Sequence, residues 1–210
     1  MTEPRFLKPQ TNSHQDTKTQ LLEVGYQLLS KKGFSAVGLQ QILTTAGIPK
    51  GSFYHYFASK EAFGEAIIEH YFLQYQARLD ALARTQTRAN QALYHYFAQW
   101  YNTQQSSCDV DKCLVVKLSA EVADLSEAMT KALYQGYEQT INWLAAQIEA
   151  SFESGDMALT AISAKSLAKR WYFAWLGASL VAKISRSNAP LDEVWQMTCD
   201  SLNISAELPS

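Results

Sequence analysis

The chain has 210 residues, of which 47% are hydrophobic and 18% are charged, and its formal net charge is −2. These proportions are typical of a water-soluble globular protein and allow one domain or two small ones. No apolar run reaches the roughly 18 residues of a membrane span, and the first fifteen residues lack the apolar core of a signal peptide. Three cysteines are too few for a disulfide framework, so we expect a cytoplasmic protein.

The net charge hides an uneven distribution along the chain. Residues 1–60 carry seven Lys or Arg and three Asp or Glu, which gives +4, whereas residues 61–210 carry eleven and seventeen, which gives −6. A uniformly acidic protein is a poor candidate for binding nucleic acid, but a protein with a basic N-terminal part is not. The two parts are therefore interpreted separately.

The spacing of apolar residues predicts helices throughout and no long strand, so the expected fold class is all-α. A flexible arm at 1–15 is followed by about nine expected helices, at 16–32, 39–46, 50–57, 60–83, 88–103, 113–123, 126–153, 160–186 and 190–203. Gly33, Gly47 and Gly155 are expected to end helices, and Ser59 and Ser126 to cap them. The pair Val115 and Val116 leaves a strand possible in the 113–123 segment.

Two short helices joined by a tight glycine-containing turn are predicted within residues 33–63, GFSAVGLQQILTTAGIPKGSFYHYFASKEAF. This arrangement is a helix-turn-helix. In the second helix Phe53 and Phe57 are spaced i, i+4 and can anchor it to a core. The outward side then carries an unusual number of aromatic rings and hydrogen-bond donors, from Lys50, Ser52, Tyr54, His55 and Tyr56.

The pattern G-F-x-x-x-x-L-x-x-I-L-x-x-A-G-I-P-K-G-S-F-Y-H-Y-F-x-S-K-E resembles the N-terminal domain of the tetracycline-repressor (TetR) family of transcription factors. The resemblance implies a homodimer that binds a palindromic double-stranded DNA operator. It implies a DNA-binding domain at 16–60 and an effector-sensing and dimerisation domain at 61–210. It assigns DNA contacts to Lys50, Gly51, Ser52, Tyr54, His55, Tyr56 and Lys60.

A charge-free run of twelve residues, 171–182, predicts a helix that is covered on both sides, since a surface helix has a polar face. One side can pack on the core of its own chain and the other on a second copy. The predicted dimer interface comprises Trp171, Trp175, Gly177, Ala178, Ser179 and Ala182. A dimer would also place two recognition helices roughly 34 Å apart, as a palindrome requires. The alternative is a central helix buried wholly within one domain.

Cys113 is the cysteine with the strongest indications of reactivity. It lies near a predicted helix N-terminus, and Lys112 and Lys117 are close in sequence, which favours the thiolate. Asp109 and Asp111 act in the opposite direction. A buried, unreactive cysteine is the alternative interpretation.

The string C-L-x-V-K-L-S-A-E-V-x-D-L-S from Cys113, with L-G-A-S-L-V-A-K-I-S-R-S at 176–187, resembles the N-ethylmaleimide-reductase-repressor subgroup of the same family. That subgroup senses quinones, reactive aldehydes and chlorine oxidants through cysteine and then releases DNA. The resemblance implies that Cys113 is the sensing cysteine, with Lys183 near it. An oxidised Cys113 could condense with Cys108 or with Lys183. Nothing in the sequence assigns a role to Cys199.

Two other classes of function stay open. A reversible small-molecule sensor would use an aromatic-lined pocket, and the candidate residues, which could equally form plain core, are Tyr94, Phe97, Trp100, Tyr101, Trp143 and Trp171. A thiol-dependent redox enzyme would use Cys108 and Cys113. No enzyme, cofactor or metal site is expected, because phosphate loops and nucleophile elbows are absent and the four histidines have no metal-ligand spacing.

Overall fold

The computed structural model describes residues 13–105, 118, 121–122 and 125–208, and this part of the chain is all-helical. Eight helices are described: α1 (Ser13–Lys32), α2 (Leu39–Ala46), α3 (Lys50–Tyr56), α4 (Lys60–Thr85), α5 (Ala89–Gln105), α7 (Glu127–Glu153), α8 (Ala164–Ser185) and α9 (Ala189–Leu202). The predicted all-α fold is confirmed. Most of the segment expected to form a helix at 113–123 lies outside the described residues. No described helix is long and apolar enough to cross a bilayer.

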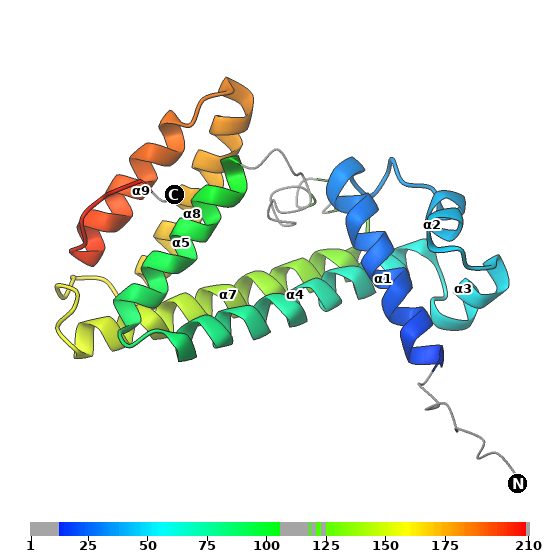
Figure 1. Ribbon diagram of the computed structural model, residues 1–210, viewed down its shortest axis with the longest axis horizontal. Coiled ribbons are helices and arrows are strands. Elements are labelled where there is room, and N and C mark those ends of the chain that lie inside the picture. Colours follow the sequence, from blue (N-terminus) through cyan, green and yellow to red (C-terminus); the bar gives the residue numbers. More distant parts are fainter. Residues whose placement is uncertain (1–12, 106–117, 119–120, 123–124, 209–210) are drawn as a thin grey trace, which may run out of the picture.

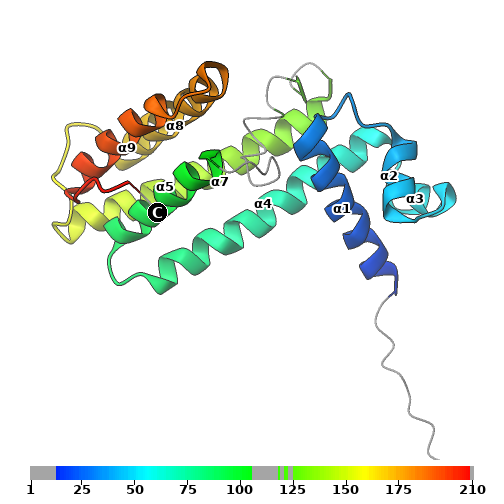
Figure 2. The same ribbon diagram turned by 45° about the horizontal axis from the view of Figure 1, so that its top comes forward.

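The molecule is elongated, with different helices at its two ends (Figure 1). Helices α1–α3 form a head at one end. Two long helices, α4 and α7, lie side by side and connect the head to the other end, where α5, α8 and α9 pack against them (Figures 1 and 2). We call the part formed by α5, α8, α9 and the distal halves of α4 and α7 the body.

Local sequence signals set most helix ends, as predicted. The hydroxyls of Ser59 and Ser126 accept the N–H groups of residues 62 and 129 at 3.1 and 3.3 Å, which caps α4 and α7. Gly155, with φ +75°, follows the end of α7. Helix α8 begins at Ala164, later than the predicted residue 160, because the Ser163 hydroxyl caps it by accepting the Ser166 N–H at 3.2 Å.

Buried apolar side chains form two clusters rather than one. The head cluster joins α1–α3 to the first half of α4, including Phe63, Ile67 and Phe72, and to the first turns of α7. The body cluster joins the second half of α4 to α5, α7, α8 and α9. The predicted division after residue 60 therefore falls at the first residue of a helix that contributes to both clusters.

The two long helices approach each other closely where α7 has a glycine. A Cβ atom on Gly136 would collide with the ring of Phe72 on α4. This close approach packs together the two helices that run from the head to the body.

Candidate nucleic-acid interface

The turn between α2 and α3 has the geometry of a helix-turn-helix. Gly47 ends α2 in the left-handed conformation, with φ +67°, and the Ile48 N–H donates to the Leu43 carbonyl at 3.0 Å. Pro49 directly precedes α3, and its carbonyl accepts the Ser52 N–H at 3.0 Å. The chain thus changes direction within three residues, and the following helix lies at the end of the molecule (Figure 1).

Two phenylalanines hold α3 in place, as predicted. Phe53 is fully buried and Phe57 is 4% exposed, and their ring centroids lie 5.4 Å apart. Both rings also pack edge-on against Phe63 of α4, at 5.2 and 4.8 Å. Because one side of α3 is committed to this aromatic cluster, the other side must face outward.

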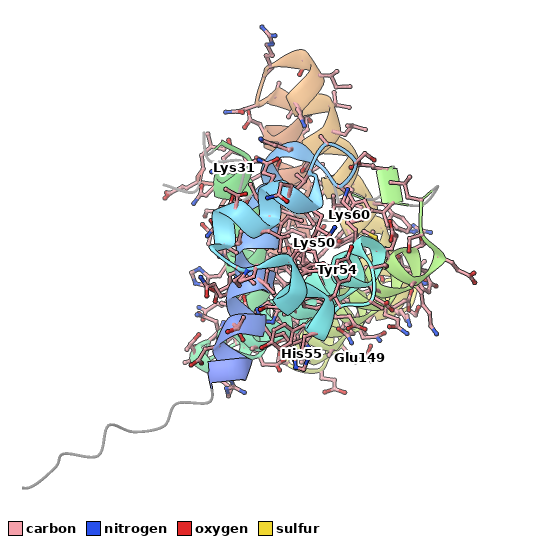
Figure 3. All side chains as sticks on the ribbon, turned by 90° about the vertical axis from the view of Figure 1, so that its right-hand side faces the viewer. Lys31, Lys50, Tyr54, His55, Lys60 and Glu149 are labelled. Carbon is pink, nitrogen blue, oxygen red and sulfur yellow. The ribbon has the colours of Figure 1, made fainter. Side chains whose placement is uncertain are left out.

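The outward side of α3 carries hydrogen-bond donors and a positive charge. Lys50, Tyr54 and His55 are exposed, and the Lys50 ammonium lies 5.9 Å from the centre of the Tyr54 ring. A Cβ on Gly51 would meet nothing within 4 Å, so another molecule can approach the backbone there. Figure 3 looks onto this end and shows Lys50 and Tyr54 near each other on the side facing the viewer. We call Lys50, Gly51, Tyr54 and His55 the α3 face.

Three other predicted DNA-contacting residues are less accessible. Ser52, Tyr56 and Lys60 are half-buried. The Lys60 ammonium donates to the Phe34 carbonyl at 2.9 Å and lies 4.3 Å from the centre of the Phe34 ring. Lys60 therefore joins the start of α4 to the loop after α1, a role within the head that the sequence did not suggest.

Glu121 binds the same loop from the other side. Its two carboxylate oxygens accept the backbone N–H groups of Phe34 and Ser35 at 2.9 and 2.5 Å. Burial acts to raise the pKa of this carboxyl. Hydrogen bonding with the Ser35 side chain and with the two backbone N–H groups, together with the charge of Lys60, outweighs it and holds the pKa below the usual value of 4.5. Gly33 makes the contact possible, because it adopts φ +84° and a Cβ there would lie 2.7 Å from a Glu121 oxygen.

Sequence reasoning did not find Glu121, although the residue belongs to the string that begins at Cys113. It accepts hydrogen bonds from backbone N–H groups that lie 86 and 87 positions earlier. Backbone N–H groups are common to almost every residue, so no side-chain pattern announces such a contact. Glu121 nevertheless follows the predicted sensing cysteine by eight residues and itself binds the loop after α1.

The predicted effector-sensing residues are only partly described. Cys108 and Cys113 lie outside the described residues, and Lys183 is exposed in the last turn of α8. Cys199 on α9 is fully buried. Burial, with a smaller contribution from Asp200, raises the pKa of the Cys199 thiol to about 11, so this cysteine is a poor nucleophile at neutral pH.

The aromatic residues proposed as pocket lining mainly fill the core of the body. Phe97, Trp100, Tyr101, Trp143 and Trp171 are buried in the body cluster, and Tyr94 is half-buried against it. The Trp100 indole N–H donates to the Ser179 hydroxyl at 3.1 Å, whereas the buried Trp143 indole N–H has no hydrogen-bond partner among the described residues. Of these six residues, only Trp100 lines the cavity where α1, α4 and α5 meet, which has a volume of about 260 Å³.

Helix α8 has an outward apolar stripe, but it is not formed by most of the residues predicted to make the dimer interface. Trp171, Trp175, Ala178 and Ser179 are buried in the core of their own chain, and Ala182 is half-buried. The helical period places Trp171, Trp175 and Ala178 along one side of α8. Residues two positions later, at 173, 177 and 180, therefore lie along the opposite side. That opposite stripe is exposed and consists of Phe173, Gly177, Leu180, Val181 and Ile184, which we call the α8 stripe.

Comparisons with known proteins point in one direction. Residues 21–67 match the family described as bacterial regulatory proteins, tetR family, and residues 89–198 match the tetracyclin repressor-like C-terminal domain. The HTH-type transcriptional repressor NemR of Escherichia coli K12 is 40% identical over 182 residues, 86% of this chain and 91% of that protein. The HTH-type transcriptional repressor DhaR of a Mycobacterium species is 31% identical over 89% of this chain and 92% of that protein.

Solved structures agree with the sequence matches. The crystal structure of the reduced form of E. coli NemR superimposes with a TM-score of 0.82 at 39% identity, over 90% of this chain and 96% of that one. A second crystal structure, described as a transcriptional regulator of the TetR/AcrR family, gives a TM-score of 0.78, also at 39% identity. The similarity therefore extends through both the head and the body.

Proposed function

The chain belongs to the tetR family of bacterial regulatory proteins, whose repressors bind operator DNA and act as dimers, and from this premise we propose how this repressor binds and releases its operator. Two copies bind a palindromic duplex in the bacterial cytoplasm through their α3 faces. Modification of Cys113 by a reactive electrophile or oxidant then releases the DNA. The family and the matched relatives are transcriptional regulators rather than enzymes.

The observation that carries the DNA-binding part is the α3 face. Lys50 supplies a positive charge for phosphate, and Tyr54 and His55 supply donors and rings that suit sugar, phosphate and base edges. All three are exposed on a helix whose other side is anchored by Phe53 and Phe57. A rigid helix with donors on its free side can enter the major groove without rearranging the head.

The α8 stripe supports a dimer formed at the other end of the molecule. Phe173 and Leu180 are each 55% exposed and Ile184 is 72% exposed, and all three lie on one side of α8. A contiguous apolar strip of this kind is unfavourable in water and is favourable against an identical strip on a second copy. Gly177 in the middle of the stripe allows two α8 helices to approach closely.

The sensing step is proposed at Cys113. The thiolate adds to an electrophilic carbon, or it is oxidised by hypochlorite to a sulfenic acid as chloride leaves. The sulfenic acid then condenses with the Cys108 thiol or the Lys183 amine, with loss of water. The 40% identity to the repressor NemR supports this assignment, as does the resemblance of the string from Cys113 to the same subgroup.

Glu121 provides a direct route from that segment to the head. It lies eight residues after Cys113 and holds the Phe34 and Ser35 N–H groups at the end of α1. A change in the segment that withdraws Glu121 would leave two backbone donors and Lys60 without this carboxylate. The head would then lose a fixed orientation relative to α4 and α7. Because two heads must match one palindrome, a small reorientation weakens operator binding.

Operator binding by purified wild type and Cys113→Ser, with and without methylglyoxal or hypochlorite, tests the sensing step. Fluorescence anisotropy of a labelled duplex should show release by treated wild type and retention by treated Cys113→Ser. Cys199→Ser is the matched control and should respond like wild type, because Cys199 is buried. Equal release by Cys113→Ser and wild type would overturn covalent sensing at Cys113 while leaving DNA binding intact.

Reversible release by a small ligand is the second candidate, and the cavity that Trp100 lines favours it. A compound that releases DNA from both wild type and Cys113→Ser would identify this route, since such a ligand does not need the thiol.

A further inference from the structure

A cavity of about 260 Å³ lies where α1, α4 and α5 meet. Five of its described lining residues are aromatic, namely Tyr26 from α1, Tyr71 and Tyr75 from α4, and Tyr96 and Trp100 from α5. Ligand sites for drug-sized molecules typically enclose about 300–1,000 Å³. This cavity is therefore matched to a smaller molecule, such as one carrying a single ring.

Three of the tyrosines form a stack along one wall. The rings of Tyr26 and Tyr71 are 5.5 Å apart between centroids, those of Tyr71 and Tyr75 are 5.6 Å apart, and both pairs are inclined by only 18°. Tyr26 and Tyr75 are half-buried, so part of each ring borders the cavity. An array of nearly parallel rings of this kind favours a flat aromatic guest, which can continue the stack or meet the ring edges.

Arg78 gives the cavity a positive charge that the described residues do not neutralise. Its guanidinium lies 5.3 Å from the centre of the Tyr75 ring, is exposed, and forms no ion pair with any described residue. None of the described lining residues is acidic. An adjoining hollow of about 50 Å³ is lined by Arg78 together with Glu23 and His70. Glu23 forms no ion pair with Arg78, so it does not neutralise the guanidinium.

We propose that this cavity is a binding site for a small single-ring aromatic carboxylate. The planar guanidinium of Arg78 can hold the carboxylate through two parallel hydrogen bonds. The ring of the ligand lies against the stacked tyrosines. Gln99 and Thr103, which also line the cavity, can bond a further polar substituent on that ring.

Ligand binding at this site would act on DNA binding through Tyr26. Tyr26 is the lining residue that comes from the head, and its stacking on Tyr71 is a direct contact between α1 and α4. A guest that alters this stack changes how α1 rests on α4, independently of Cys113. This regulatory consequence rests on the repressor function proposed above, whereas the binding site rests on the cavity alone.

Calorimetric titration of the full-length protein tests the site without DNA. We expect benzoate to bind with a dissociation constant below about 1 mM. Benzamide keeps the ring but lacks the charge, and cyclohexanecarboxylate keeps the charge but lacks the π-system. Both should bind at least about tenfold more weakly, since each loses one of the two interactions.

Arg78→Gln should weaken benzoate binding by about tenfold or more, because the guanidinium supplies both charge and geometry. The matched control is Arg84→Gln, since Arg84 is exposed on the same helix and does not line the cavity. Circular dichroism of both variants confirms folding. The proposed site would be wrong if benzoate did not bind at about 10 mM, which is tenfold above the expected dissociation constant. It would also be wrong if Arg78→Gln and Arg84→Gln bound benzoate equally well.

The regulatory consequence is tested separately with Cys113→Ser protein bound to labelled operator. Saturating benzoate should lower operator affinity in this background and should do so far less when Arg78→Gln is added. Benzoate that binds without changing operator affinity would overturn the regulatory consequence and leave the site established. Failure of the sensing step at Cys113 alters neither result, because the variant lacks that thiol.

Discussion

The α3 face and the α8 stripe lie at opposite ends of the molecule and both expose large side chains, but they differ in chemistry (Figure 1). Lys50, Tyr54 and His55 on α3 each carry an N–H or O–H group at the tip of the side chain. Phe173, Leu180 and Ile184 on α8 carry none. Exposure alone therefore does not identify a partner.

The difference indicates which partner suits each surface. Phosphates and base edges interact with charges and hydrogen-bond donors, so DNA suits the α3 face. A second protein copy gains most from excluding water between apolar surfaces, so it suits the α8 stripe. The acidic composition of residues 61–210 fits this division, because the part that carries the α8 stripe does not need to approach phosphate.

The largest expected effect comes from placing a charge in the α8 stripe. Leu180→Asp should convert the dimer to a monomer, because two carboxylates would face each other in an apolar contact. Operator affinity should fall by about 100-fold or more, since one head then binds one half-site. Sedimentation velocity measures the dimer and anisotropy measures the affinity.

Leu159→Asp is the control, because Leu159 is 81% exposed but lies outside α8. If the two variants had the same oligomeric state and the same operator affinity, this interface would be contradicted.

Removing a ring from the α3 face should have the next largest effect. Tyr54→Ala should lower operator affinity by about tenfold or more, the scale of one lost specific contact. The thermal unfolding temperature should barely change, because Tyr54 is 50% exposed. Tyr134→Ala offers a matched comparison, since Tyr134 is 61% exposed on α7, and it should bind like wild type. If both tyrosine variants bind equally well, Tyr54 does not contact the operator.

Glu121 binds the loop after α1 in the head, and its substitution should have a moderate effect. Glu121→Gln should lower the free energy of unfolding by about 1–2 kcal/mol, because charge-assisted hydrogen bonds to Phe34 and Ser35 are weakened. It should also reduce the difference in operator affinity between untreated and electrophile-treated protein. Glu149→Gln, at an exposed position on α7, is the control and should leave both quantities unchanged.

The contribution of Glu121 should depend on pH in a defined direction. Its pKa is lower in the folded protein than the usual 4.5, so the folded state favours the charged form. The stabilisation is therefore fully present above the usual value and is lost as the pH falls through the lower folded pKa. Denaturant titrations should show a constant difference between wild type and Glu121→Gln from about pH 8 to pH 5 that shrinks in more acidic solution.

The smallest expected effect concerns Cys199, which is buried on α9. With a pKa of about 11, only about one thiol in 1,000 is ionised at pH 8, and the side chain is fully buried. Iodoacetamide should therefore leave Cys199 unmodified in the native protein, as measured by peptide mass, and should modify it after unfolding in guanidinium. Rapid alkylation of Cys199 in the native state would show that the α8–α9 packing opens readily.

The features that the sequence predicted correctly are those set by neighbouring residues along the chain. The caps at Ser59 and Ser126, the left-handed Gly47 and the inward Phe53 and Phe57 all depend on residues within one or two turns, and each is confirmed. For these reasons the helix-turn-helix and the exposed residues Lys50, Tyr54 and His55 could be located before the structure was known.

Features that depend on contacts between distant segments could not be predicted. The small residues at 177–182 suggested which side of α8 meets a partner, but the tryptophans on that helix occupy the body core and turn the other stripe outward. The link from Glu121 to Phe34 joins a carboxylate to backbone groups 87 positions away. The cavity is lined by Tyr26 of α1, Tyr71 of α4 and Trp100 of α5, a combination that no spacing within one helix encodes.

The central claim, that the head binds operator DNA as part of a dimer, is tested most directly by one titration. Wild-type protein is added to a labelled palindromic duplex, selected by this protein from a random-sequence library, at increasing sodium chloride concentrations. We expect saturation at two chains per duplex, or a multiple of two. The affinity should fall steeply and linearly on logarithmic axes as the salt concentration rises, because Lys50 and neighbouring cations displace counterions. Saturation at one chain per duplex, or an affinity indifferent to salt, would contradict it.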